Sequence, residues 1–289
     1  MRTFETALKT DWILDRAFRG IIRSALALPY HTRVQWFGKF VERGIAPVAG
    51  YLKRAEDQLA LIWPELPAAE RRDLARACCN NFGRTIIENY SGADFARQIE
   101  NATVSGDGLI PMAKAKAEGR PVLFVTGHFG NHEAPRQALT QRGYSIGGLY
   151  RPMANPYLNS HYEKSMLSMS GAVFAQGRRG TMGFVRMLRD GGMGTLLFDV
   201  RASGFPSAPF LGHDANTATS AADIALKVGA LVIPYFGIRR GDGLGFDVVV
   251  EAPILPSTST QMMAEMTARL EARIYANPDQ WFWVHRRWG

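Results

Sequence analysis

The stretch VLFVTGHFGNHE, residues 122–133, gives the clearest indication of the fold of this chain. Its first five residues are apolar, aromatic or β-branched without alternation, and Gly127 ends the run. An uninterrupted apolar run predicts a central strand that is covered on both faces. Open parallel sheets hold their ligands beyond the carboxyl ends of such strands. We therefore expect the polar residues from His128 to Glu133 to lie at a functional site.

This polar cluster places an imidazole five residues before a carboxylate. His128 precedes Glu133 across a Gly130-Asn131 turn, which can bring the second side chain back toward the first. An imidazole can take a proton from a hydroxyl group near neutral pH, and a carboxylate on its other nitrogen fixes the tautomer. The spacing thus predicts a general base, His128, and its orienting group, Glu133, without a protein nucleophile. The nucleophile would be the hydroxyl group of a substrate.

Two other interpretations of these residues remain open. A single histidine and a glutamate at a loop-to-helix junction are often a surface residue and a helix cap. A metal site is the second alternative, because His128 and His132 are four residues apart and Glu133 follows. The order H-x-x-x-H-E matches neither H-E-x-x-H nor H-x-x-E-H, and Gly130 interrupts the helix that such a site needs. We expect no metal and no cofactor, and the role of His132 stays open.

Segments of strand and helix character alternate over the rest of the chain. The expected strands are 122–126, 144–150, 172–175, 195–200, 231–237 and 246–251. The helices expected between and after them are 134–142, 156–169, 181–190, 218–228 and 258–276. This alternation predicts an α/β fold with a mostly parallel central sheet and helices on both faces.

Composition describes one large globular chain with a basic surface. The chain has 289 residues, a hydrophobic content of 46% and a formal net charge of +8. That length favours one α/β domain, placed at residues 101–289, with a helical N-terminal extension at residues 1–100. The adjacent Cys78 and Cys79 cannot form an ordinary disulfide framework, which favours a reducing compartment. The positive charge favours anionic partners such as an acidic lipid surface or an acidic carrier protein.

The amino end is basic and amphipathic. Residues 1–54 hold ten Lys/Arg and four Asp/Glu, so six of the eight net charges lie there. Apolar residues recur at helical spacing over 12–28, 34–41 and 48–61, and residues 68–90 form a further helix. Charged residues interrupt every apolar run before the roughly 20 residues that a bilayer requires. The pattern predicts helices in a membrane interface, unless their apolar faces pack on the parent domain.

Charged residues also follow other predicted strands, at the same sheet edge as His128. Arg151, the pair Arg178 and Arg179, and Asp199 each stand at or just after such an end. Arginines can hold a phosphate or carboxylate by forked hydrogen bonds, although ordinary loop arginines are the alternative for each. The tail WFWVHRRW, residues 281–288, mixes indoles with cations, which suits a membrane interface or inward packing of the aromatic rings.

Other common sites are absent from the sequence. GRRGTMG provides neither a G-x-G-x-x-G fingerprint nor a Walker sequence, and no G-x-S-x-G is present. No recognised nucleic-acid-binding module accompanies the basic charge, so we expect no nucleic acid partner.

GHFGNHE resembles the G-H-x-G-N-W-E block of the lipid A biosynthesis late acyltransferases, a lauroyl/myristoyl acyltransferase family within the lysophospholipid acyltransferase superfamily, whose signature is H-x4-D/E. The likeness extends to GLYRPMANP at 148–156, the strand ending at Asp199, PFLGHDANTATSAADIALKVGALVIP at 209–234 and the closing WFWVHRRW. Two positions depart from the family: His132 replaces the usual Trp, and DVRASG at 199–204 replaces a more acidic stretch similar to D-x-D-x-G.

The resemblance implies a glycerol-3-phosphate acyltransferase-like fold and a peripheral enzyme on the cytoplasmic face of the inner membrane. It would move a fatty acyl chain from an acyl-carrier-protein thioester to a hydroxyl group of a lipid A precursor or related lipid. A lysophospholipid or lyso-aminolipid O-acyltransferase that uses acyl-ACP or acyl-CoA is the alternative. A non-catalytic membrane- or nucleic-acid-binding protein is a further one.

The resemblance also implies roles for individual residues. His128 would be the base and Glu133 its orienting carboxylate. The residues expected to bind substrate are Arg151, Asp199, Asn131, Arg178, Arg179 and Arg286.

Overall fold

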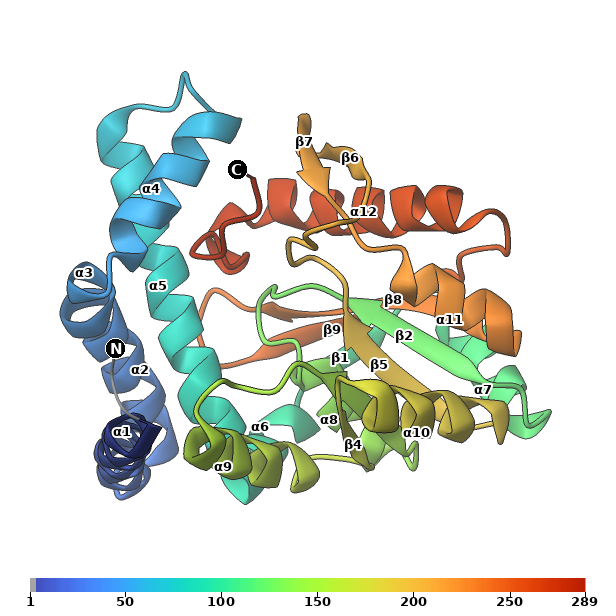
Figure 1. Cartoon of the computed structure of the whole chain (residues 1–289), viewed down its shortest axis with the longest axis horizontal. Coiled ribbons are helices and arrows are strands. Elements are labelled where there is room, and N and C mark those ends of the chain that lie inside the picture. Colours follow the sequence, from blue (N-terminus) through green and yellow to red (C-terminus); the bar gives the residue numbers. More distant parts are fainter. Residues whose placement is uncertain (1–3, 289) are drawn as a thin grey trace.

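A seven-stranded sheet lies at the centre of the molecule (Figure 1). The structure, a computed structural model, describes residues 4–288, so the first three residues of the expected extension lie outside it. The strand order is β1-β9-β8-β2-β5-β3-β4. In chain order the strands are β1 (Thr103–Ser105), β2 (Val122–Thr126), β3 (Ile146–Tyr150), β4 (Val173–Ala175), β5 (Met193–Leu197), β8 (Leu231–Arg239) and β9 (Phe246–Val250). The prediction of a mostly parallel α/β sheet is confirmed.

β2 is the central strand and runs parallel to both of its neighbours, β5 and β8. All five of its residues are buried, as its continuous apolar sequence predicts. Because successive side chains point to opposite faces of a sheet, Leu123 and Val125 join one hydrophobic cluster, and Val122 and Phe124 join the other.

Helices cover both faces of the sheet. The cluster that contains Leu123 is completed by α10 (Arg178–Arg189), α11 (Ser220–Val228) and α12 (Ser259–Ala276). The cluster that contains Phe124 is completed by α6 (Ala93–Glu100), α7 (Leu109–Ala117), α8 (Ala134–Gln141) and α9 (Pro156–Leu167). The carboxyl end of β2 leads into a loop that is bonded to the N-terminal helices, since Thr85 Oγ1 donates a hydrogen bond to the Gly130 carbonyl.

The sheet is not parallel throughout, because β9 runs antiparallel to β8. The sequence identified β9 but not its direction. Residues 240–245 join the two strands in a tight turn, in which the Asp242 carboxylate accepts hydrogen bonds from the backbone N–H groups of Leu244 and Gly245. Such a short connection can join only antiparallel neighbours, since a parallel pair needs a crossover.

Helices stack against one end of the sheet in the N-terminal third of the chain (Figure 1). They are α1 (Phe4–Leu26), α2 (Tyr30–Phe40), a π-helical turn (Val41–Ile45), α3 (Ala46–Val48), α4 (Tyr51–Ile62) and α5 (Ala68–Tyr90). Val34 and Phe37 of α2 are buried with Ile22 of α1, so the inner faces of these helices pack on the protein. Trp12 and Ile13 remain exposed on the outer side. Over residues 4–288, every helix is too short or too polar to cross a bilayer.

Some boundaries differ from the sequence prediction. The expected helix 48–61 is interrupted at Gly50, whose φ of +70° is left-handed, and α10 begins at Arg178 rather than at residue 181. A hairpin of β6 (Ser207–Phe210) and β7 (His213–Asn216) was not predicted, because its two four-residue strands show no clear apolar alternation. The division of the chain at residue 100 stays a prediction.

The C-terminal segment folds back beside the loop that follows β2. After the 3-10 turn η2 (Pro278–Gln280), Trp281 forms an isolated bridge with Phe129, and Phe282 N donates a hydrogen bond to the His128 carbonyl at 2.9 Å. Trp281 and Trp283 are buried. Of the two interpretations of the tail, inward packing is therefore correct for these two rings.

Candidate active site

His128 follows the end of β2 with only Gly127 between them. A β-carbon on Gly127 would lie 2.8 Å from Leu270 Cδ2 and 3.0 Å from Asp199 Oδ2, so this position needs glycine for α12 and Asp199 to approach. The His128 side chain is 34% exposed, whereas the strand before it is buried. The fold thus presents an imidazole at the rim of the core, within reach of a substrate.

Asp199, and not Glu133, is the carboxylate bonded to His128. Asp199 Oδ1 lies 2.8 Å from His128 Nδ1, and Asp199 Oδ2 accepts a hydrogen bond from the His128 backbone N–H at 2.8 Å. The contact arises because β5 lies next to β2, so that Asp199 emerges beside His128. The expectation that Glu133 orients His128 is corrected accordingly.

The Asp199 carboxylate is enclosed by protein groups. It is 3% exposed, and its Oδ2 accepts a further hydrogen bond from Trp281 Nε1 at 2.9 Å. Both oxygens are thus directed at neighbouring side chains and the His128 backbone. This arrangement corrects the expectation that Asp199 faces the acceptor, and it makes Asp199 the group that holds His128.

His128 and Asp199 each shift the pKa of the other. Burial lowers the pKa of His128, but the negative charge and hydrogen bond of Asp199 outweigh burial and raise this pKa above its usual value. Burial raises the pKa of Asp199, yet the charge and hydrogen bonds of His128 and the Trp281 N–H leave this pKa well below its usual range. The carboxylate therefore stays ionised and stabilises the imidazolium form, as a general base requires.

Glu133 lies behind the site in a second buried pair. Its Oε2 is 3.3 Å from Arg136 Nη1, and both side chains are buried. Arg136 Nε also donates to the Ile146 carbonyl at 2.9 Å, which connects α8 to β3. The pair forms because Glu133 immediately precedes α8 and stands three residues before Arg136 on the same helix face. The structure thus gives Glu133 a contact that supports the loop.

Asn131 is fully buried and ties the same loop to α5. Its Nδ2 donates to Glu88 Oε2 at 2.9 Å, and its Oδ1 accepts from the Glu133 backbone N–H at 3.0 Å. Glu88 is paired with Arg239 of β8, with Arg239 Nη1 at 2.5 Å and Nη2 at 2.8 Å from its two oxygens. The expectation that Asn131 contacts substrate is corrected: its side chain is enclosed in a buried network.

Gly130 is the tightest point of the loop. Its φ is +53°, and a β-carbon there would lie 1.9 Å from the Gly237 carbonyl oxygen of β8. Its N–H donates to the Gln280 carbonyl at 2.9 Å, and its own carbonyl accepts from Thr85 Oγ1 at 2.9 Å. The loop is therefore held from α5, β8 and the C-terminal segment at once.

His132 lies next to His128 without bonding to it. The two ring centroids are 5.7 Å apart, and burial is the main cause that lowers the pKa of His132 to about 4. His132 is therefore neutral at physiological pH. No group of three His, Cys, Asp or Glu side chains in residues 4–288 is arranged to hold a metal ion.

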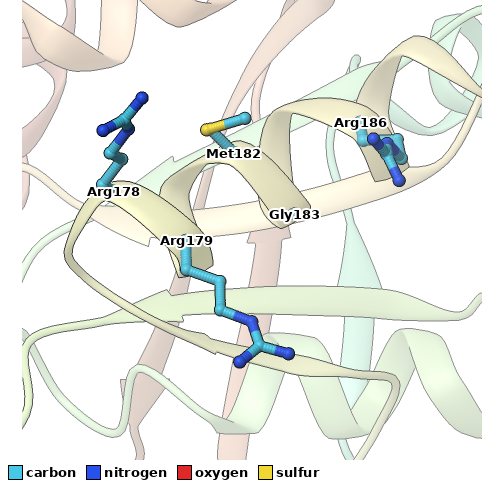
Figure 2. A pocket seen from close by; sticks show the side chains of 5 residues that line it. All are labelled: Arg178, Arg179, Met182, Gly183 and Arg186. Atoms are coloured by element: carbon cyan, nitrogen blue, oxygen red, sulfur yellow. The ribbon is translucent and has the colours of Figure 1, made fainter.

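The predicted arginines Arg151, Arg178 and Arg179 do not all lie beside the His128–Asp199 pair. Arg151 is exposed just after β3, and its charge, after burial and the charges of His128 and Arg287, contributes to the lowered pKa of His285. Arg178 and Arg179 begin α10 and line a separate groove (Figure 2). Of Arg151, Arg178 and Arg179, only Arg151 is among the charges that act on His285, a residue beside the His128 site.

The closing arginines of the chain differ from each other. Arg286 is exposed, as the expected contact with an anionic head group requires. Arg287 is 1% exposed; its Nη1 donates to the Asn216 carbonyl at 2.8 Å and its Nη2 to Thr217 Oγ1 at 2.6 Å. Arg287 therefore fixes the tail to the β7–α11 connection and is not available to a head group.

Three contributors to the site were not predicted from the sequence. Trp281 donates to Asp199, Phe282 lies beside the His128 ring with centroids 6.1 Å apart, and His285 Nε2 accepts from the Arg201 backbone N–H at 3.0 Å. The aromatic tail was the available signal, but its sequence contains no information on which strand end it meets.

The arrangement is suited to removing a proton from a bound hydroxyl group. His128 Nδ1 is held by Asp199, and among residues 4–288 no side chain or backbone group bonds to Nε2. In the described residues no serine, threonine or cysteine is hydrogen-bonded to the His128 ring, so the site has a base and its orienting carboxylate but no protein nucleophile bonded to the base.

Comparison with known proteins gives a family and several relatives. Residues 5–289 match the family model described as bacterial lipid A biosynthesis acyltransferase. The chain is 25% identical over 256 residues to the lipid A biosynthesis palmitoleoyltransferase of Escherichia coli K12, covering 82% of this chain and 79% of the relative. It is 25% identical over 242 residues to the lauroyltransferase of the same organism, covering 79% and 76%. It is 24% identical over 283 residues to the lipid A biosynthesis acyltransferase of Haemophilus influenzae, covering 92% and 87%.

Proposed function

The chain belongs to the bacterial lipid A biosynthesis acyltransferases, and we propose that it transfers a fatty acyl group from a carrier thioester to a hydroxyl group of a lipid A precursor or a related lipid. It is an enzyme that transfers acyl groups other than aminoacyl groups. The observation that carries the proposal is the His128–Asp199 pair, in which a buried carboxylate holds Nδ1 and leaves Nε2 free for a substrate.

In the proposed reaction His128 acts as the general base. Its Nε2 takes the proton of the acceptor hydroxyl group as the acceptor oxygen attacks the thioester carbonyl carbon. When the tetrahedral intermediate collapses, the carbon–sulfur bond breaks and the imidazolium returns the proton to the departing thiolate. One thioester is replaced by one ester and the base is regenerated, while Asp199 stabilises the imidazolium in between.

Exposed arginines near this pair are suited to hold the acceptor. Arg151 follows β3, the strand beyond β5, and Arg286 leaves the tail beside the site; both side chains are exposed. A guanidinium group binds phosphate oxygens in a forked geometry. We assign these two arginines to an anionic group of the acceptor, and we assign Glu133 and Asn131 to holding the His128 loop.

The acceptor is tested directly with purified protein. The protein is incubated with an acyl thioester and a lipid A precursor in one reaction, and with the same thioester and a lysophospholipid or lyso-aminolipid in another. The masses of the product lipids are measured by mass spectrometry. The proposal expects one added acyl chain on the lipid A precursor. Acylation of the lysolipid alone would support the alternative acceptor. If wild-type protein acylates neither, a non-catalytic binding protein is the remaining interpretation.

For the donor we propose acyl carrier protein rather than coenzyme A alone. The physical support is charge: carrier proteins are strongly acidic, and this chain carries a net charge of +8. Attraction of this kind raises the rate of encounter and weakens as salt increases. Initial rates with the same acyl chain on each carrier, at low and moderate salt, separate the two donors.

We propose that the enzyme acts at the cytoplasmic face of the inner membrane as a peripheral protein. The support is the outer side of the N-terminal helices, where Trp12 and Ile13 are exposed and the Arg16 guanidinium lies 5.2 Å from the Trp12 ring centroid. Indole rings with adjacent cations suit the head-group region of an anionic bilayer.

A further inference from the structure

The exposed face of α10 carries a basic groove that the proposed chemistry does not use. Arg178, Arg179, Met182, Gly183 and Arg186 line a space of about 460 Å³ (Figure 2). All three guanidinium groups are exposed, and Met182 between them is 61% exposed. The groove is thus a basic surface with one apolar side chain at its centre.

The arginines of this groove lack partners within the chain. In the described residues 4–288, Arg178, Arg179 and Arg186 make no ion pair and no side-chain hydrogen bond. Other partly exposed arginines are paired: Arg240 with Asp247 at 2.7 Å and Arg269 with Glu265 at 2.7 Å. The α10 cations are therefore free to interact with an external acidic group.

The packing of α10 keeps the groove arginines on the solvent side of the helix. Phe184 and Leu188, on the opposite side of α10, are buried in the core cluster that contains Leu123. Between Arg178 and Arg189 the helix contains no acidic residue. The buried side fixes the orientation of α10, so the cationic side stays in solvent.

The spacing of the groove residues favours an extended partner. Arg178, Met182 and Arg186 are four residues apart along the helix and form one stripe about 12 Å long. Figure 2 shows Arg178 and Met182 rising from the same side of the ribbon. One phosphate group can reach one end of such a stripe, whereas a helix with several acidic side chains can contact both ends and cover Met182.

The stripe lies at the edge of the sheet that carries the active site. Only two residues separate the end of β4 from the start of α10, and β4 is separated from β2 by β3 and β5. At about 4.8 Å between neighbouring strands, β4 lies about 14 Å from β2 across the sheet. A partner docked on α10 would be beside the His128 site, at a distance that a flexible thioester arm can cover.

We propose that the Arg178–Met182–Arg186 stripe is the docking surface for an acidic helix of the carrier protein that delivers the acyl thioester. This rests on the proposed thioester-dependent transfer. A membrane surface is less suited to the stripe, because Met182 is its one strongly exposed apolar residue. Exposed indole rings lie instead on α1 and α2, in the stack of N-terminal helices and not on α10 (Figure 1).

The test compares two double charge reversals in the full-length protein. Arg178→Glu with Arg186→Glu removes the stripe. Arg120→Glu with Arg142→Glu is the matched control. In the described part of the chain both residues are exposed and make no ion pair, and they precede β2 and β3, away from α10. The same acyl chain is supplied on acyl carrier protein and on coenzyme A, and kcat/KM is measured for each donor at low and moderate salt.

The stripe variant is expected to lower the ratio of the two kcat/KM values, carrier protein over coenzyme A, on the order of tenfold at low salt, mainly through KM. The control variant should retain the wild-type ratio. An unchanged ratio in the stripe variant, or an equal fall in the control, would overturn the docking surface. So would a loss of anionic-vesicle binding in the stripe variant with no change in the ratio, since this outcome assigns the stripe to the membrane.

A binding measurement separates this inference from the function itself. Unacylated acyl carrier protein is titrated into the wild-type, stripe and control proteins, which needs no turnover. Weaker binding to the stripe variant alone supports docking even if no acceptor is acylated. Equal binding to all three contradicts docking even if transfer from a thioester is observed.

Discussion

The loop after β2 and the outer face of α1 use charged residues in opposite ways. In the loop and its supports, each buried charge has a partner at close range: Asp199 with His128, Glu133 with Arg136 and Glu88 with Arg239. The outer face of α1 presents cations and apolar side chains to solvent.

On that outer face the charges have almost no internal role. The Arg16 guanidinium lies over the ring of Trp12, and Ile13 beside it is 59% exposed. The inner face of the same helix is different: Asp15 is fully buried and bonds to Arg19, whose Nη2 donates to the Tyr157 carbonyl at 3.2 Å. One helix therefore combines a packed side with a side that exposes Trp12, Ile13 and Arg16 to solvent.

The difference separates two kinds of function. Buried, paired charges fix geometry and are little affected by salt, and removal of one partner leaves the other charge uncompensated. Exposed, unpaired cations fix nothing internally, but they attract anionic surfaces and are screened by salt. We therefore expect changes in the loop to act on turnover and stability, and changes on the outer face to act on association.

The largest effect is expected at His128. Substitution His128→Ala removes the base and should lower kcat by about 10² to 10⁴, because general base catalysis has that typical value. The fold should persist, since the side chain is partly exposed at the rim of the core. Single-turnover kinetics with a lipid acceptor measures the effect. His31→Ala is the control, because His31 is exposed on α2. Near wild-type turnover in His128→Ala would refute the mechanism.

The second effect is expected behind the loop, at Glu88. Glu88→Gln leaves Arg239 as an uncompensated buried charge, which typically costs about 3 to 5 kcal/mol of stability. Asp57→Asn breaks an exposed pair with Lys53 and should cost at most about 1 kcal/mol. Chemical denaturation of both variants gives the comparison. Similar losses in the two would mean that burial does not distinguish these pairs.

The sequence was sufficient for the features that depend on local pattern. The continuous apolar run of β2 predicted a buried strand, and Gly127 marked its end, so His128 was correctly expected just beyond that end. Helix α5 was predicted with its observed bounds, because Pro67 precedes it and its apolar spacing continues without interruption.

The features that depend on strand order were not predictable in this way. Asp199 was singled out as a polar residue at a strand end, but its bond to His128 spans 71 residues and requires β5 to lie beside β2. The nearer Glu133 was preferred because sequence distance favoured it. Trp281 joins Asp199 across 82 residues, and no local pattern indicates that contact.

A smaller effect concerns pH. The neutral His128 is the active base, so kcat/KM should fall as pH decreases through its pKa, which Asp199 raises above 6.5. Asp199→Asn removes the charge that favours the imidazolium, and the acidic limb of the pH profile should move to lower pH while the plateau falls. Glu133→Gln is the control, because Glu133 is bonded to Arg136 and not to His128. An equal shift in the two variants would contradict the assignment of Asp199.

The smallest effect is expected on the outer face of α1. Truncation of residues 1–54 is unsuitable as a test, because Val34 and Phe37 of α2 are buried and their removal would open the core. Point changes avoid this problem. Trp12→Ser with Ile13→Ser removes two exposed apolar side chains and should weaken binding to anionic vesicles by on the order of tenfold, since burial of one such side chain is worth about 1.5 to 3 kcal/mol when complete.

The control for this change is Leu226→Ser with Leu255→Ser. Leu226 is 40% exposed and Leu255 is 80% exposed, and they lie on α11 and in the segment before α12. These side chains lie at the opposite end of the sheet from α1 (Figure 1), so the control should bind vesicles as the wild type does. Binding of the α1 variant should also remain dependent on salt, because Arg16 and the neighbouring cations are retained. Equal loss in both variants would show general surface hydrophobicity, and no loss in either would move membrane contact away from α1.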